Sequence, residues 1–525
     1  MEENKINPGV DRLCTWILAI ATVVVILTCH QYGICWDEPA QHGLGLDYWH
    51  VYTSLLHDRM GVRRWDRIYG GFYEMPAVAI SQYFPTHIYD VRHYLNAFTG
   101  LIGILGCWKL GRMMGGSVAG LLTLCTTLLF PSYIGHMFNN SKDIPFAAAY
   151  IWAVFFMIKV FYEFPDNAKT NFVKFGLTAG ATAGVRVGGM VLFPIFGFTW
   201  ILYFLIEWFH RTGSQIRADV VAVFRLAIVS FILGYGLMCL FWPWAQLNPV
   251  THPFQALKAF SNFQGIYIGN RWYALEALSL KVPDGILVGT LLAVFLILYR
   301  LKDVLQTVRS AEPKEWGKFC AYGALVSSFT LPIAFVIIKR SNLYNEIRQI
   351  IFVVLPLIVG TSITLTRILE MTHNRILHAL WVVGIMGFLA LPAWGMYKLF
   401  PYEYIYVNAL AGRLKRTNIV DLTCDYELHS LRALAGQLKN YLLTRDGDRF
   451  WKTTYTVFIH GPAPCMSYYL PMNIRFVDEH FANEAQFGVF CDCEYQEHRP
   501  YNEIGQVSRD GVPLTHLVAY EPISK

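Results

Sequence analysis

Charged residues are scarce in this sequence. Only 15% of its 525 residues are Asp, Glu, Lys or Arg, whereas a soluble globular protein carries about a quarter. With a mean hydropathy of +0.36, this deficit argues against a disordered chain and against an ordinary soluble enzyme. The sequence also lacks a Gly-X-Y period, heptad runs and low-complexity tracts, which excludes collagen, coiled coils and tail-like proteins. It has no block of Lys or Arg, so we expect no nucleic-acid partner.

Long apolar stretches are abundant instead. A bilayer core about 30 Å thick needs roughly 17–25 apolar residues per helix. The sequence therefore predicts an α-helical polytopic membrane protein with about 11 transmembrane helices over residues 1–400, surrounded by membrane lipids. The stretches are 13–29, 94–110, 118–134, 145–161, 175–191, 192–209, 220–240, 286–301, 319–338, 350–365 and 377–399.

The first stretch follows a short polar segment and lacks a small-x-small cleavage site, so it is interpreted as an uncleaved anchor. A cytoplasmic N-terminus places many basic residues in inside loops, which agrees with the positive-inside rule. An odd number of spans then places residues 401–525 on the outside. The inside basic residues include Arg112, Lys159, Lys169, Lys174, Arg211, Arg217, Arg300 and Lys302.

The composition changes after about residue 400, and acidic residues slightly outnumber basic ones in the rest of the chain. Leucines at helical spacing predict a helix over 427–443. Short β-rich runs predict strands at 455–460, 474–477, 487–491 and 514–520. Residues 401–525 are therefore expected to form a small α/β domain outside the membrane.

Four cysteines lie in this C-terminal region: Cys424, Cys465, Cys491 and Cys493. Outside the membrane they could form disulfides, with three possible pairings, or remain free thiols. The sequence leaves both states open. A zinc site is the less favoured reading because a C-x-C pair lacks the usual spacing.

Polar residues are concentrated in a long first outside loop, residues 31–92. It begins with Asp37 and Glu38, followed by His42, at the start of a segment with one apolar helical face. We expect this helix to lie on the outer surface of the bilayer. A carboxylate at its N-terminus is stabilised by the helix dipole and stays ionised, so Asp37 could accept a proton from a hydroxyl nucleophile. The alternative is that Asp37 only caps the helix.

Three further acidic or basic residues follow in outside loops. Glu74, near the end of the first loop, is either a second functional carboxylate or a solvated loop charge. Lys142 could bind phosphate as a point charge. Asp143 is expected to cap the helix that starts at Pro145.

Basic residues also lie near the outer ends of later spans. Arg186, among glycines near the end of the fifth span, either faces the bundle interior or extends to the interface. Tyr344 and Arg348 lie in a short outside loop. Arg348 could contact an anionic headgroup in a site, or a lipid phosphate at the rim.

The chain resembles the glycosyltransferase C superfamily, in the branch of protein O-mannosyltransferases and lipid A aminoarabinose transferases. The resemblance covers about residues 1–410, and the region beyond about 425 matches no family that we can name. Its three most specific motifs are Trp36-Asp37-Glu38-Pro39, Tyr73-Glu74-Met75-Pro76 and Asn140-Ser141-Lys142-Asp143-Ile144-Pro145.

This resemblance implies a sugar transferase that uses a polyprenyl-phosphate-linked sugar donor on the outer side of the membrane. It implies that Asp37 is the general base and that Glu74 and Asp143 position the acceptor or the sugar. Aminoarabinose transferases tend to have Lys where this chain has Met75, which puts that particular sugar in doubt. The remaining residues implied to bind substrate are Glu38, His42, Lys142, Arg186, Tyr344 and Arg348, of which Lys142, Arg186 and Arg348 would neutralise the carrier phosphate.

The resemblance leaves the acceptor open among glycans, lipids and proteins. It suggests a bacterial inner-membrane protein with its active site and C-terminal domain in the periplasm. No compact ligand cluster is evident, so we predict no metal or cofactor, although a divalent metal is possible because some superfamily members use one. The alternative is a multi-span transporter or lipid flippase, but the sequence shows no internal repeat of the kind such proteins often have. A membrane-anchored scaffold is a third reading.

Overall fold

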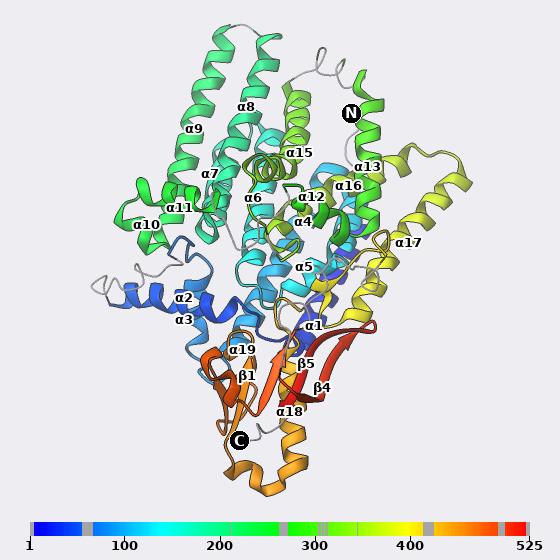
Figure 1. The fold of residues 1–525 in the computed structure, drawn as a ribbon. Coiled ribbons are helices and arrows are strands. Elements are labelled where there is room, and N and C mark those ends of the chain that lie inside the picture. Colours follow the sequence, from blue (N-terminus) through cyan, green and yellow to red (C-terminus); the bar gives the residue numbers. More distant parts are fainter. Residues whose placement is uncertain are drawn as a thin grey trace.

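The computed structural model describes residues 5–54, 67–211, 213–261, 271–302, 306, 309, 313–343, 345–412, 425–491 and 499–520. Helices dominate these residues, and a small sheet follows near the C-terminus (Figure 1). The long helices are α1 (Pro8–Thr28), α4 (Ile88–Leu128), α6 (Asp143–Glu163), α7 (Ala168–Val185), α8 (Leu192–Trp208), α9 (Gly213–Leu240), α13 (Asp284–Tyr299), α15 (Pro313–Lys339), α16 (Ile351–Met371) and α17 (Arg375–Leu399).

All eleven apolar stretches predicted from the sequence are largely helical, but they do not make eleven equal spans. Within the described residues, seven helices are long and apolar enough to cross a membrane, and a bent pair makes a possible eighth. That pair is α12 (Tyr273–Lys281) with α13, bent by 116°. By length and composition, the described residues thus support seven of the about eleven predicted spans, or eight with the bent pair. The chain is an integral membrane protein by this criterion and by its fold.

The second predicted stretch and most of the third belong to one element, α4. Its 41 residues are interrupted at Gly116, which adopts a φ of 83°. A residue with a Cβ rarely adopts this conformation, and a Cβ here would also approach the backbone of Lys5. The glycine therefore permits a break in the helix where Lys5 passes.

Small residues allow the apolar helices to pack closely. In the contact of α7 with α9, a Cβ on Gly180 would collide with the backbone of Gly234. Such close approach is the usual role of small residues between membrane helices. This close packing holds the end of α7, at Val185, next to Arg186.

The loop over residues 31–92 contains two of the short elements near the site. Helix α2 (Glu38–Thr53) buries Leu44, Tyr48 and Val51, the apolar face predicted from the sequence. Helix α3 (Glu74–Ser81) follows after residues 67–73. The backbone amides of Gly71 and Phe72 donate to carbonyls at the ends of α9 and α7. These bonds fix the start of α3 against the bundle.

Shorter elements connect the long helices. They are η1 (Cys29–Gln31), α5 (Pro131–His136), η3 (Val187–Val191), α10 (Pro243–Leu247), α11 (Thr251–Ser261), η4 (Arg348–Ile350) and η5 (Glu403–Ile405). Two of them, α5 and η4, border the site described below.

The C-terminal region forms a five-stranded mixed sheet in the order β2-β1-β3-β5-β4. The strands β1, β2 and β3 are parallel, whereas β5 is antiparallel to both β3 and β4. Four strands were predicted, and β4 was missed. The elements are α18 (Leu431–Asp446), η7 (Gly447–Lys452), β1 (Tyr455–Ile459), α19 (Pro464–Ser467), β2 (Ile474–Val477), η8 (Glu479–Glu484), β3 (Phe487–Phe490), β4 (Tyr501–Arg509) and β5 (Val512–Tyr520).

Figure 1 shows this sheet region at one end of the helical bundle, close to α2 and α3. The connection between α8 and α9 lies at the opposite end. The apolar core of the sheet region also includes Ile34, Leu399, Tyr402 and residues 404–407. The division into domains at residue 400 stays a prediction, because both parts of the chain share this core.

Of the four C-terminal cysteines, Cys424 and Cys493 lie outside the described residues. Cys465 is a buried free thiol, and its sulfur lies 3.5 Å from the carbonyl oxygen of Cys35. The thiol alternative therefore holds for Cys465.

Candidate active site

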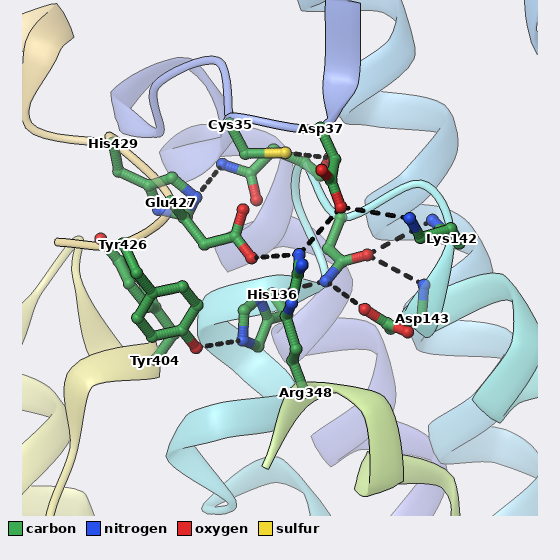
Figure 2. A network of polar contacts seen from close by, with 12 residues as sticks. Cys35, Asp37, His136, Lys142, Asp143, Arg348, Tyr404, Tyr426, Glu427 and His429 are labelled. Carbon is green, nitrogen blue, oxygen red and sulfur yellow. Dashed lines mark hydrogen bonds and ion pairs between the residues drawn. The ribbon is translucent and has the colours of Figure 1, made fainter. Parts of the chain in front are cut away.

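Four segments that are far apart in the sequence meet around Asp37 and Arg348. Lys142 Nζ lies 3.2 Å from Asp37 Oδ2, and Arg348 Nη1 lies 2.9 Å from the same oxygen. Arg348 Nη1 also lies 2.9 Å from Glu427 Oε1. Figure 2 shows the four side chains pointing toward one another. The structure thus brings together a base candidate and two cations predicted from the sequence.

Asp37 is the most accessible charged group of this cluster. Its side chain is 28% exposed, whereas Lys142 is 8% exposed, Arg348 4% and Glu427 fully buried. Burial by itself would raise the pKa of Asp37, but Lys142 and Arg348 outweigh this effect and hold the pKa well below its usual range. Asp37 therefore carries its negative charge at neutral pH.

Asp37 also occupies the N-cap position of α2, as the alternative interpretation expected. However, its side chain accepts no hydrogen bond from the helix amides. Its carboxylate contacts the two cations instead, because Lys142 and Arg348 lie within hydrogen-bond distance.

Lys142 follows the short helix α5 and precedes α6. Burial would lower the pKa of Lys142, but the Asp37 carboxylate more than offsets it, and the pKa lies above its usual range. The ammonium also lies 4.7 Å from the ring centre of Tyr69, a favourable cation–π distance. Lys142 is therefore charged although it is nearly buried.

Asp143 does not cap the following helix. Helix α6 already begins at Asp143, and the Asn140 side chain accepts the Asp143 backbone N–H at 2.9 Å. The Asp143 carboxylate pairs with Arg186, at 2.5 Å from Nη1, and accepts from Asn140 Nδ2 at 2.9 Å. The predicted capping role is wrong because Asn140 supplies the acceptor.

Arg186 lies in the break between α7 and η3, with extended backbone. Its side chain is 9% exposed, so it faces the protein interior and does not extend to the interface. Lys142 and Asp143 are adjacent in the chain, and Arg186 therefore adds a third cation beside the Asp37 cluster.

A second buried network lies under α2 and α3. Arg92, on α4, binds Glu74 through Nη2 at 2.7 Å, and its Nε lies 3.7 Å from Glu38. Glu38 also contacts His93 Nε2 at 3.0 Å, and Ser141 donates to Glu74. All five side chains are buried. Glu74 is therefore not a solvated loop charge, and Ser141 links this network to the Lys142 segment.

Sequence reasoning missed Arg92. It lies at the start of a predicted apolar span, where nothing in the sequence pairs it with carboxylates 18 and 54 positions away. Its position beside a predicted span left two readings: an arginine there either extends to the membrane interface or faces the bundle interior and pairs with a partner.

His42 lies on α2, one turn after Glu38. Burial first, and then the charge of Arg92, lower the pKa of His42 to about 4, so its imidazole is neutral. Its ring centre lies 5.9 Å from that of Tyr89. His42 therefore borders the Arg92 network and not the Asp37 cluster. One more of the predicted binding residues, Tyr344, lies outside the described residues.

Residues before α18 reach into the site from the C-terminal region. The backbone carbonyl of Glu427 accepts from Trp36 N at 3.0 Å. His429 Nε2 lies 2.6 Å from Asn139 Nδ2, and the phenol of Tyr426 lies 3.0 Å from His136 Nε2. Figure 2 shows the contacts of Tyr426 and His429, and together the three bonds hold Glu427 against Arg348.

No sequence pattern indicated that Glu427 belongs to the site. It was assigned to the first turn of a helix over 427–443, whereas α18 begins only at Leu431. Residues 425–430 are non-helical because they bind the loop before α2 and the α5–α6 connection.

Two cavities lie away from this cluster. One has an empty volume of about 440 Å³ and is bordered by Trp394, Lys398 and Asp510. Another, of about 430 Å³, lies between membrane helices near Pro283 and Phe388. Across the described ranges, no three His, Cys, Asp or Glu side chains come together in a metal-binding arrangement. The expectation of no metal and the possibility of a divalent metal therefore both stay predictions.

Comparison with known proteins shows the fold. The oligosaccharyltransferase of Archaeoglobus fulgidus in the apo form matches with a TM-score of 0.52 at 12% identity, over 91% of this chain and 69% of that protein. ArnT from Cupriavidus metallidurans bound to undecaprenyl phosphate gives a TM-score of 0.49 at 13% identity, over 96% of this chain and 97% of ArnT. No protein-family model matches the chain, and no curated protein matches its sequence.

The likeness to the archaeal enzyme establishes the architecture. The chain is an α-helical membrane protein with the glycosyltransferase C fold and a small C-terminal sheet region, as its motifs predicted. At 12% identity this likeness concerns the fold alone. What the protein does must be argued from its site.

Proposed function

We propose that this protein is a glycosyltransferase, a hexosyl- or pentosyltransferase, that moves a sugar from a polyprenyl-phosphate-linked donor to an acceptor hydroxyl. We place the reaction on the outer, periplasmic face of a bacterial inner membrane, with residues 401–525 as a domain on the same side. One observation carries the proposal: Asp37 is partly exposed and ionised, and two nearly buried cations contact it.

Asp37 acts as the general base. Both cations contact Oδ2, so Oδ1 is the oxygen we assign to the acceptor proton. The acceptor oxygen forms a bond to the anomeric carbon of the sugar while its proton passes to Asp37. The bond from that carbon to the phosphate oxygen breaks, and its electron pair leaves with the phosphate. A positioned base of this kind contributes roughly 10²–10⁴ in rate.

Lys142 and Arg348 stabilise the leaving phosphate. Preorganised cations are most effective where charge develops in a water-poor site, and both side chains are less than 10% exposed. When the donor phosphate shares these cations, their hold on Asp37 weakens. The basicity of Asp37 then rises at the moment when a base is needed. Arg186 supports the same phosphate from beside Asp143.

The remaining residues position substrates. Glu74 and Glu38 are fixed by Arg92 and His93, so they offer rigid acceptors to hydroxyl groups of the sugar or acceptor. Asp143 is fixed in the same way by Arg186. His42 and Tyr344 complete the predicted set. Glycan, lipid and protein hydroxyls all fit the proposed chemistry.

The runner-up function is a transporter or lipid flippase. The substrate sites of such proteins typically lie near the bilayer midplane, between broken helices. The charged cluster lies instead near the end of the bundle that carries α2, α3 and the sheet region. The archaeal protein that shares this fold is an oligosaccharyltransferase, which also favours the transferase.

A reconstituted assay separates the two functions. The purified protein is incubated in liposomes with radiolabelled polyprenyl-phosphate sugars and an extract of envelope acceptors. A transferase converts the donor to free polyprenyl phosphate and places the label on an acceptor. Recovery of intact donor under all conditions, with or without translocation across the bilayer, would contradict the proposal.

A further inference from the structure

The charges around Arg348 balance before any substrate binds. Lys142 and Arg348 carry two positive charges, and Asp37 and Glu427 can carry two negative ones. Asp143 and Arg186 form a separate neutral pair beside them. A phosphodiester donor brings one further negative charge. Because the site is nearly buried, this extra charge is costly unless it is compensated.

We propose that Glu427 provides this compensation: it takes up a proton when the donor phosphate binds, which releases Arg348 Nη1 from Glu427 to the phosphate. The inference rests on the proposed function, because the ligand is the donor phosphate of that reaction. It assigns a positioning role to a residue of the C-terminal region, which acts on the reaction through Arg348.

The geometry selects Glu427 among the carboxylates of the site. A single nitrogen, Arg348 Nη1, lies 2.9 Å from Glu427 Oε1 and 2.9 Å from Asp37 Oδ2. Any phosphate that approaches Arg348 therefore competes with both carboxylates. Asp37 keeps Lys142 as a second cation, whereas the other oxygen of Glu427, Oε2, is buried and has no hydrogen-bond partner within the described residues. Protonation of Glu427 therefore breaks fewer favourable contacts than protonation of Asp37 would.

The surroundings of Glu427 already favour its neutral form. Burial, together with the negative charge of Asp37, raises the pKa of Glu427 to about 7, although Arg348 opposes this rise. The nearby imidazoles of His136 and His429 have pKa values lowered by burial, to about 3 for His136, so they contribute no positive charge. The titratable or charged groups that face Glu427 are Arg348, Asp37, Asp143, Lys142, Cys35, Cys465, Tyr404 and Tyr426.

The affinity for the donor should therefore depend on pH. Below pH 7 Glu427 is already protonated, and the donor binds without further change. Above pH 7 Glu427 is an anion, and binding must first bring a proton from solvent. Donor affinity therefore falls as the pH rises through 7, by at most about tenfold per pH unit for one proton.

The test measures donor binding between pH 5.5 and 8.5 on the full-length protein in nanodiscs. The probe is a polyprenyl-phosphate hexose, because a phosphodiester keeps one charge over this range, whereas the second ionisation of a phosphate monoester falls near pH 6. The variant is Glu427→Gln, which keeps the size of the side chain and an acceptor for Arg348.

Glu403→Gln is the matched control. Glu403 is also a buried carboxyl whose pKa burial raises to about 7. It accepts a hydrogen bond from the Tyr32 phenol at 3.0 Å and does not belong to the Arg348 cluster. A general effect of losing a buried carboxyl would therefore appear in both variants.

We expect the dissociation constant of the wild type to rise about tenfold or more between pH 6.5 and 8.5. Glu427→Gln should bind with a nearly constant affinity, tighter than the wild type at pH 8.5, and Glu403→Gln should follow the wild type. A flat wild-type profile, or an unchanged slope in Glu427→Gln, would overturn the inference.

Calorimetry in two buffers of different ionisation enthalpy adds a measurement that needs no variant. At pH 8 the wild type should take up close to one proton per donor bound, and uptake of none would overturn the inference even if Glu427→Gln fails to fold. Absence of donor binding by all three proteins at every pH would instead contradict the proposed function itself.

Discussion

At the scale of single residues, two cations decide the protonation state and the direction of the Asp37 carboxylate. An exposed aspartate at a helix N-terminus would be an ordinary cap, worth about 1 kcal/mol to the helix. Here Lys142 and Arg348 direct the same carboxylate away from the helix amides. The pKa of Asp37 is lowered by these cations and not by the helix, so its ionisation depends on residues 105 and 311 positions away.

Arg348 gives the first prediction at this scale. Arg348→Ala removes the guanidinium that we assign to the donor phosphate. A hydrogen bond to a charged group contributes about 1.5–3 kcal/mol, so the KM for the donor should rise roughly 10- to 100-fold. Glu427 can become neutral in this variant, which limits the damage to the fold. Steady-state kinetics with varied donor concentration measure the effect.

Arg112→Ala serves as its control. Arg112 pairs with Asp11 through two nitrogens and does not contact the cluster. Its removal should leave the donor KM unchanged. A donor KM in Arg348→Ala equal to that of the control would show that Arg348 does not bind the donor phosphate.

At the scale of elements, α2, α3 and α4 are joined by buried charge. Arg92 on α4 holds Glu38 at the start of α2 and Glu74 at the start of α3. The start of each short helix is thus fixed to a membrane helix beside the site. This arrangement gives Glu38 and Glu74 the rigidity that positioning residues need.

Arg92→Met tests this network. It leaves two buried carboxylates without their cation, and breaking a buried ion pair costs about 3–5 kcal/mol. The midpoint of thermal unfolding in detergent should fall strongly. Arg112→Met is the control, because Arg112 and Asp11 are 33% and 19% exposed and a pair near the surface contributes at most about 1 kcal/mol. Equal shifts in the two variants would contradict the account of the network.

Helices could be predicted well from the sequence and the sheet only in part. Apolar runs long enough for a bilayer have few other interpretations, so each predicted stretch is largely helical. Strand β4 was missed because Tyr501–Arg509 is mostly exposed and polar, without the alternation that marks a half-buried strand. Residues 427–430 were wrongly placed in a helix because their partners lie in distant segments.

At the scale of the whole molecule, the site is assembled at one end. The end of α1, the helices α2 and α3 and the sheet region lie together there (Figure 1). The sequence predicted Asp37, Lys142 and Arg348 because each lies in a short polar motif next to an apolar span. Arg92 and Glu427 could not be predicted, because no local pattern reveals a partner that only the packed bundle brings near.

This arrangement predicts where reagents reach the protein. Cysteines introduced at Ser54, after α2, and at Met472, which is 97% exposed, should both react with a membrane-impermeant maleimide added to intact spheroplasts. A cysteine at Phe209, which is 81% exposed near the α8–α9 connection, should react only after lysis. Protection of Ser54→Cys and Met472→Cys in intact spheroplasts would contradict the periplasmic orientation.

The central claim is that Asp37 removes the proton of the acceptor, and Asp37→Asn tests it most directly. The amide keeps the shape of the side chain but cannot act as the base. In the liposome assay we expect transfer to fall at least about 100-fold, while the polyprenyl-phosphate donor still binds. Asp448→Asn, an exposed site in η7, should transfer at the wild-type rate. Near wild-type transfer by Asp37→Asn would contradict the account.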